Sequence, residues 1–329
     1  MSADKLLTVL FNAGVGVSII ATVMSLGMSF TVAEVLAPLR RVVPVVLLIV
    51  VNCLLIPAAA WGLFKAFGIK DAYVSGATLA AVGAAGAMGL KAAQLARRAD
   101  LPLAVSAVIV LQLLNLIAVP LWAGQVVSGA SISAVTILKD LLLLVLIPLA
   151  IGLAVRWRYA DHAKGWQPEL VKVANLALGL ALIAGIAVNW STIVSLLGSR
   201  VLLASLVVVI VSLAAGYFVG GRDARARAST GLVSGVRFTA LGLIIIGTQL
   251  HANPDYLGPA IVFALVDMIV AIIVALEMGR RARASTSGDR PAVARDGGQA
   301  ASPGSHKAVL VEVGRFGQRF SGAAPYRER

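Results

Sequence analysis

Long apolar blocks recur along this chain and constrain its fold more than any other feature. Each block has about 20 predominantly apolar residues, enough for a helix to cross a hydrocarbon core about 30 Å thick. Hydrophobic residues make up 59% of the sequence and charged residues only 13%, whereas soluble domains are roughly 45–50% apolar and 25% charged. The chain has too little polar surface for a water-soluble body, and we predict an all-α membrane protein.

Nine transmembrane helices are predicted. They cover residues 7–30, 43–67, 72–98, 101–125, 133–156, 169–188, 199–220, 224–250 and 257–280. Beyond residue 281 the composition changes to Ser, Gly, Ala, Pro and Arg. We therefore predict a transmembrane transporter domain over 1–281 and a disordered basic cytoplasmic tail over 282–329. Within the tail, residues 308–320 form either an amphipathic helix on the membrane surface or part of a solvated segment without a role.

Lysine and arginine are unevenly distributed between the two sides of this predicted domain. Fourteen fall on one side, namely Arg40, Arg41, Arg97, Arg98, Arg156, Arg158, Lys164, Lys172, Arg222, Arg225, Arg227, Arg280, Arg281 and Arg283, and four on the other, namely Lys5, Lys65, Lys70 and Arg200. Because cytoplasmic loops carry the excess of Lys and Arg, we predict a multi-pass protein of the cell membrane. Its N-terminus would lie outside and its C-terminus in the cytoplasm. The net charge of +13 then reflects topology and not nucleic-acid binding.

Residue types that would support catalysis or metal binding are sparse. The single cysteine, Cys53, lies within an apolar block, and the three histidines are far apart in the sequence. No Gly-x-Ser-x-Gly sequence and no close pair of carboxylates occurs in the predicted spans. We therefore predict neither an enzyme nor a protein with a metal cluster. A channel is disfavoured because the sequence has no repeated filter loop.

Two predicted spans, 72–98 and 224–250, are interrupted by glycines, and each contains a cation. Glycine lies at positions 76, 83, 86 and 89 of the first span and at 231, 235 and 242 of the second. The embedded cations are Lys91 and Arg237. A charge deep in a span costs about 2.5–3.5 kcal/mol on insertion, so an embedded cation indicates a functional site.

These two interrupted spans lie five spans apart, and this odd offset gives them opposite orientations if they correspond. Glycine-interrupted spans at matching positions in two halves are typical of inverted-repeat transporters. Broken helices would place half-helix N-termini, whose free N–H groups attract anions, at mid-membrane. The alternative is that the glycines only allow helices to pack closely.

Several stretches resemble the bile acid:sodium symporter family of secondary transporters. They include residues 24–30 (MSLGMSF), 52–61 (NCLLIPAAAW) and 95–97 (LAR), in this order and spacing. The resemblance covers roughly residues 8–280. It implies a panel domain that moves against a core domain built around two crossing, discontinuous helices. Substrate would bind beside the crossover and sodium behind it, among hydroxyl, amide, carbonyl and carboxylate oxygens.

The two crossover segments depart from the family pattern. Residues 85–90 (AGAMGL) replace a run similar to GGTSSN, and residues 233–238 (VSGVRF) replace a run similar to EVGMQN. The acidic ligand position is Val233 and the amide position is Arg237, so that Asn52 is the one matching amide. A methyl group cannot bind sodium and a guanidinium repels it. The resemblance implies coupling to sodium, but these residues argue against a sodium site. The alternative is coupling to a proton, or transport without a coupling ion.

Candidate substrate-binding residues follow from these spans. Lys91 and Arg237 would supply positive charge, and Asn52, Ser234 and Thr239 would supply polar contacts. The alternative for Lys91 is that its long side chain extends toward the cytoplasmic cluster at Arg97 and Arg98. Hydroxyls that donate to their own helix carbonyls are the common alternative.

Three further polar residues lie within apolar spans. Gln112 and Asn115 share a helical face and would either line the cavity or form an interhelical hydrogen bond. Asp267 would form an ion pair with Arg237 or Lys91. In one interpretation Asp267 is a coupling residue, and its protonation or substrate binding breaks the pair. In the other, the pair is static and only cancels charge.

The function predicted from these features is secondary transport of a small organic anion by alternating access. The alternative is a ligand-binding membrane sensor with the same fold and no coupled transport. The sequence alone leaves open which anion is carried, the direction of transport, the coupling ion and the oligomeric state.

Overall fold

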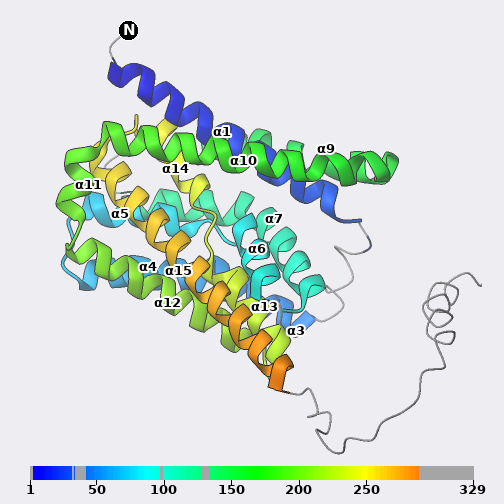
Figure 1. Cartoon of the computed structure of the whole chain (residues 1–329). Helices are drawn as coiled ribbons and strands as arrows, with labels where there is room; N and C mark the ends of the chain where they lie inside the picture. Colours follow the sequence, from blue (N-terminus) through cyan, green and yellow to red (C-terminus); the bar gives the residue numbers. More distant parts are fainter. Residues whose placement is uncertain (1–2, 32, 34–41, 97–98, 128–132, 289–329) are drawn as a thin grey trace, which may run out of the picture. The chain divides into compact units, whose positions relative to one another are not determined.

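The computed structural model describes residues 3–31, 33, 42–96, 99–127 and 133–288, and all regular secondary structure in these ranges is helical (Figure 1). The described residues up to Ser287 form one compact unit. The α-helices are α1 (Ala3–Ser29), α3 (Val42–Val50), α4 (Ile56–Ala66), α5 (Asp71–Val82), α6 (Ala87–Ala96), α7 (Leu101–Val126), α8 (Ala134–Leu141), α9 (Ile147–Arg158), α10 (Ala160–Val188), α11 (Trp190–Leu196), α12 (Arg200–Val219), α13 (Ala224–Gly235), α14 (Thr239–Gln249) and α15 (Pro254–Gly288). Two π-helical turns, η2 (Val51–Leu55) and η3 (Leu142–Leu146), join α3 to α4 and α8 to α9.

Eight helical stretches in the described part of the chain are long and apolar enough to cross a membrane. They correspond to eight of the nine predicted spans. The remaining prediction, 72–98, is divided into α5 with 12 residues and α6 with 10. The stretch at 224–249 is divided in the same way, into α13 with 12 residues and α14 with 11. The prediction of an all-α, multi-pass membrane protein is confirmed.

Two predicted helix boundaries were wrong. The expected polar connection at 157–168 is helical except for Tyr159, because α9 continues to Arg158 and α10 begins at Ala160. Its polar residues are compatible with a helix, since Lys164 pairs with Asp161 one turn earlier at 3.2 Å. The last span also continues past its predicted end, because α15 extends to Gly288.

Some predictions concern residues outside the described ranges. These are the arginines at 40, 41, 97 and 98 that entered the charge count, and the tail from 289 onward, including its predicted amphipathic segment at 308–320.

The helices form two packed groups. The panel consists of α1, α9 and α10, which pack against one another (Figure 1). Gly27 of α1 allows its backbone to touch α9, because a Cβ at Gly27 would lie 2.6 Å from the Leu149 carbonyl oxygen. The core contains α4 to α7 and α12 to α14, and α15 joins it through Phe263, whose ring contacts that of Phe64 edge-on.

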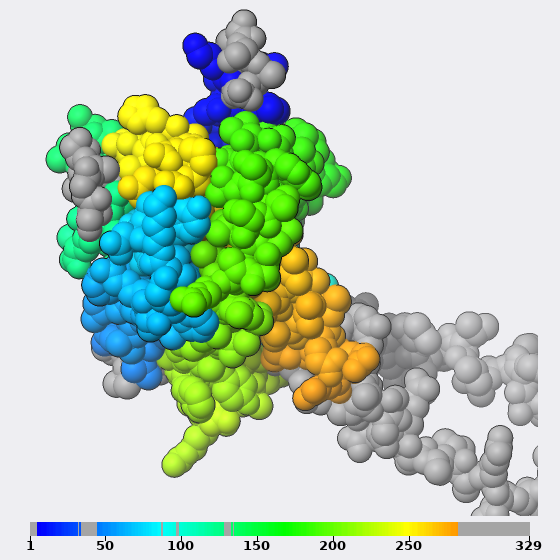
Figure 2. All heavy atoms as spheres, turned by 90° about the vertical axis from the view of Figure 1, so that its left-hand side faces the viewer, coloured from blue at the N-terminus to red at the C-terminus, as the bar shows by residue number. Residues whose placement is uncertain are grey.

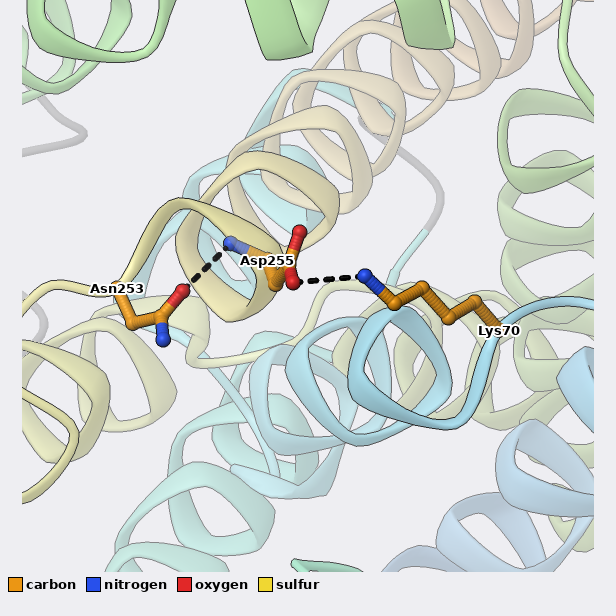
Figure 3. Close-up of polar contacts among 3 residues, drawn as sticks. All are labelled: Lys70, Asn253 and Asp255. Atoms are coloured by element: carbon orange, nitrogen blue, oxygen red, sulfur yellow. Dashed lines mark hydrogen bonds and ion pairs between the residues drawn. The ribbon is translucent and has the colours of Figure 1, made fainter.

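One end of the molecule is closed by contacts between connecting segments. Figure 2 shows this face, where the α4–α5 segment (blue), the segment with α11 (green) and the segment between α14 and α15 (yellow) pack side by side. Arg200 Nη1 donates to the Phe67 carbonyl across them (3.3 Å). Lys70 Nζ donates to Asp255 Oδ2 at 2.7 Å, and Asn253 Oδ1 accepts from the Asp255 N–H (Figure 3). The hydrogen bond to Asp255 raises the pKa of Lys70.

Candidate functional site

The two glycine-interrupted segments cross in the core, as predicted. Helix α5 ends at Val82 and α13 at Gly235, and non-helical residues 83–86 and 236–238 separate them from α6 and α14. At the crossing, the Gly86 N–H donates to the Val236 carbonyl (3.1 Å) and the Phe238 N–H to the Gly83 carbonyl (2.8 Å). This pairing is antiparallel, so the two interrupted segments run in opposite directions, as the odd offset predicted.

Glycine is required where the two backbones meet. A Cβ at Gly83 would lie 2.5 Å from the Phe238 carbonyl oxygen, and one at Gly86 would lie 2.9 Å from the Arg237 carbonyl oxygen. Both distances are shorter than a real Cβ contact, so alanine would push the segments apart. Between the two glycines, Ala85 has a left-handed backbone with φ of 54°, which is uncommon for a residue with a side chain.

Gln112 and Asn115 of α7 satisfy the backbone of the first break. Asn115 Oδ1 accepts from the Ala84 N–H (2.9 Å), and its Nδ2 donates to the Ala84 carbonyl (3.0 Å). Gln112 Nε2 donates to the Ala85 carbonyl at 3.0 Å, and its Oε1 accepts from Asn115. Both side chains are fully buried. Of the two alternatives for these residues, the structure forms the interhelical hydrogen bonds and places neither residue in the lining of the cavity below.

The guanidinium of Arg237 is buried and fully hydrogen-bonded. Nε donates to the Ala81 carbonyl (2.7 Å), and Nη2 donates to the carbonyls of Val82 (3.0 Å) and Asn52 (3.1 Å). Nη1 donates to Asn52 Oδ1 (3.0 Å) and, more weakly, to the Ser234 carbonyl (3.5 Å). A guanidinium has five N–H donors, and all five are used, so that none is free for a substrate.

Asn52 is held in place by the same network. It lies in η2 and is fully buried. Its Nδ2 donates to the hydroxyl oxygen of Ser234 (2.8 Å) and to the Leu48 carbonyl (3.0 Å). Ser234 is also fully buried and is not among the residues that line the cavity. Two of the polar residues expected to contact substrate, Asn52 and Ser234, thus contact each other.

The structure corrects the predicted ion pair of Asp267. Its Oδ2 accepts from the backbone N–H of Arg237 at 3.2 Å, and no side-chain ion pair joins Asp267 to Arg237 or Lys91 in the described residues. The pair does not form because the guanidinium points away, toward the helix ends. Asp267 is buried, and its Oδ1 has no hydrogen-bond partner among the described residues.

A cavity of about 340 Å³ lies between the panel and the core. Panel helices α1 and α10 line one side, and α6, α14, α15 and the α13–α14 break line the other. Helices α6 and α14 both begin at this cavity, which Gly86, Met88, Phe238, Thr239 and Ala240 help to line. The first N–H groups of a helix have no intrahelical partner, so both beginnings present donors and partial positive charge.

The charged and polar side chains of the cavity come from both groups of helices. Lys91 lines it, is half-buried and has no ion pair among the described residues. Asp267 and Thr239 also line it. Polar residues of the panel that were not predicted from the sequence also line it; they are Ser18, Thr22, Ser25 and Asn175. The first three recur at helical spacing on one face of α1, and this periodicity was the signal available in the sequence.

Comparison with known proteins agrees with this architecture. A family model described as "Sodium Bile acid symporter family" matches residues 17–220, more than half of the chain. This match begins within α1, at residue 17, and includes the first crossover segment; the second crossover segment at 224–249 follows it. A search of curated proteins found no match. From the matched residues and the crossing of two broken helices, we conclude that the chain belongs to the sodium bile acid symporter family, a family of transporters.

Proposed function

We propose that this protein is a secondary transporter that carries small organic anions across the cell membrane by alternating access. The observation that carries the proposal is the cavity between panel and core. Two half-helix N-termini and the Lys91 ammonium face one space of about 340 Å³. Free N–H groups at helix beginnings bind anions, and an ammonium without a carboxylate partner supplies the balancing charge.

The proposed substrate contacts are those that the cavity exposes. Lys91 would bind the anionic group of the substrate, and Thr239 and the first N–H groups of α6 and α14 would donate hydrogen bonds to it. Ser18 and Thr22 would contact the substrate from the panel. The remaining predicted residues would act indirectly, by holding the crossover in shape; they are Asn52, Gln112, Asn115, Ser234 and Arg237.

The position of the cavity supports an inward-facing state. The cavity extends from the crossover toward Leu95 and Ala275, on the side where the charge count places the cytoplasm. On the opposite side, Gly185 of the panel lies against Ile261 of the core, since a Cβ at Gly185 would be 2.9 Å from the Ile261 side chain. We therefore propose an external N-terminus, a cytoplasmic C-terminus and a cavity open to the cytoplasm.

The test is counterflow in liposomes that contain the purified protein. Labelled monocarboxylates and sulfonates would be offered to vesicles preloaded with the same unlabelled compounds. Lys91→Gln should raise KM roughly 10- to 100-fold, because a hydrogen bond to a charged group contributes about 1.5–3 kcal/mol. Lys139→Gln is the matched control, because Lys139 is exposed on α8. Unchanged KM in Lys91→Gln would place the anion site elsewhere.

The same preparation separates transport from sensing. Saturable binding of a labelled anion to the purified protein, with no counterflow in liposomes, would support a ligand-binding sensor instead of a transporter. Counterflow that requires the unlabelled anion inside the vesicles would support the transporter.

A further inference from the structure

The Arg237 guanidinium occupies a cage made only of uncharged oxygen atoms. Two oxygens are the carbonyls of Ala81 and Val82, the last residues of α5, and a third is the carbonyl of Ser234 near the end of α13. Carbonyls in the last turn of a helix have no intrahelical partner and carry partial negative charge. Two half-helix C-termini therefore converge on one buried cation.

The other two oxygens belong to Asn52, and the local helix geometry explains why its carbonyl is free. In the π-helical turn η2, the Ile56 N–H donates to the Val51 carbonyl, five residues earlier. The same register would pair the Asn52 carbonyl with residue 57, but Pro57 has no N–H. Arg237 Nη2 donates to this carbonyl, and Trp122 Nε1 donates to the adjacent Cys53 carbonyl at 2.8 Å.

Oxygen cages of this kind suit hard monovalent cations. In transporters with broken helices, half-helix C-termini and unwound carbonyls bind sodium, and hard cations take amide and carbonyl oxygens as ligands. Here the cation is already present, because the guanidinium is covalently part of α13–α14 and donates to every oxygen of the cage. The residues around this cage do not fit a sodium ion, since the ion would have to displace the guanidinium or approach its positive charge.

We propose that Arg237 is a tethered cation that takes the place of a coupling sodium ion, so that this member of a sodium symporter family works without sodium. The buried positive charge stabilises the crossover permanently, whereas a bound ion would enter and leave. The cation site follows from the hydrogen bonds of Arg237, and its link to coupling rests on the transport function proposed above.

The first experiment measures thermal unfolding of the purified protein in sodium chloride and in choline chloride of equal ionic strength. The wild type should unfold at the same temperature in both salts. Arg237→Gln and Arg237→Ala remove the tethered charge and leave the oxygens, so their unfolding temperature should fall in choline and rise saturably with sodium. At ten times the Kd the rise should be about 3 °C.

Chemical rescue distinguishes a cation site from a general salt effect. Guanidinium chloride at low millimolar concentration should raise the unfolding temperature of Arg237→Ala, because the free ion fits the space that the side chain leaves. Arg200→Ala, which removes an exposed arginine, is the control and should respond to neither cation. If Arg237→Ala does not fold, Arg237→Gln keeps most of the volume, and the wild-type measurement needs no variant.

Two results would overturn the proposal. One is a saturable sodium response of the wild type, in unfolding temperature or in counterflow, since the site would then already accept the ion. The other is the absence of any response to sodium or guanidinium in both Arg237 variants. If the wild type shows no counterflow in any salt, but the Arg237 variants still respond to sodium and guanidinium in thermal unfolding, the transport function is contradicted. The assignment of Arg237 as a tethered cation would then still hold.

Discussion

Adding one methyl group at Gly83 tests the crossing of the two broken helices. Gly83 has φ of −59° and ψ of 114°, which alanine adopts freely, so the effect of Gly83→Ala is purely steric. The new Cβ would lie 2.5 Å from the Phe238 carbonyl oxygen. Relief of this clash requires the two segments to separate, which breaks the two backbone hydrogen bonds at the crossing.

The magnitude follows from these two losses. Two hydrogen bonds contribute about 1–3 kcal/mol together, and overpacking adds about 1–3 kcal/mol. Gly83→Ala should therefore lower the free energy of unfolding by about 2–6 kcal/mol, measured as a lower unfolding midpoint when SDS is titrated into the protein in a mild detergent.

Gly62→Ala provides the matched control for this measurement. Gly62 lies within α4, and a Cβ there meets no atom within 4 Å. The same substitution should stabilise this helix by about 0.5–1 kcal/mol, because glycine loses more backbone entropy than alanine on folding. Equal stability of Gly83→Ala and Gly62→Ala would show that the segments do not meet at this distance.

Two further predictions concern titratable groups. If Asp267 couples transport to a proton, counterflow of wild-type protein should vary with pH and that of Asp267→Asn should not; an unchanged pH profile in the variant removes the proton role. Because the hydrogen bond to Asp255 raises the pKa of Lys70, this pair stabilises the fold at pH values below the ordinary lysine pKa, and the stabilisation is lost as pH rises through the raised value. Lys70→Met should therefore reduce the alkaline fall of the unfolding midpoint more than Lys139→Met does, and equal curves would contradict a folding role for the pair.

Much of the architecture could be predicted from the sequence because membranes impose simple rules. Apolar blocks of fixed length predict spans, and lipid forces the backbone to be helical. Glycines at 83, 86 and 235 indicated where helices break or approach closely, and the structure places 83 and 86 at the crossing itself. The boundary near Tyr159 could not be predicted in this way, because polar residues such as Asp161 are typical of a loop, whereas here Asp161 pairs with Lys164 along a helix.

The directions of the polar side chains depended on the tertiary structure. The sequence alone determined that a cation, Arg237, lies in a broken span and that amides at 52, 112 and 115 lie in apolar ones. It did not determine which backbone groups would lose their partners when α5, α13 and η2 end or distort. Those orphaned carbonyls and N–H groups exist only once the helices have packed and crossed, and burial requires each to find a donor or an acceptor. For this reason the Arg237 guanidinium points toward the helix ends, although the residue also lines the cavity. Among the described residues that line the cavity, Lys91 is the cation whose charged group has no ion pair or hydrogen bond.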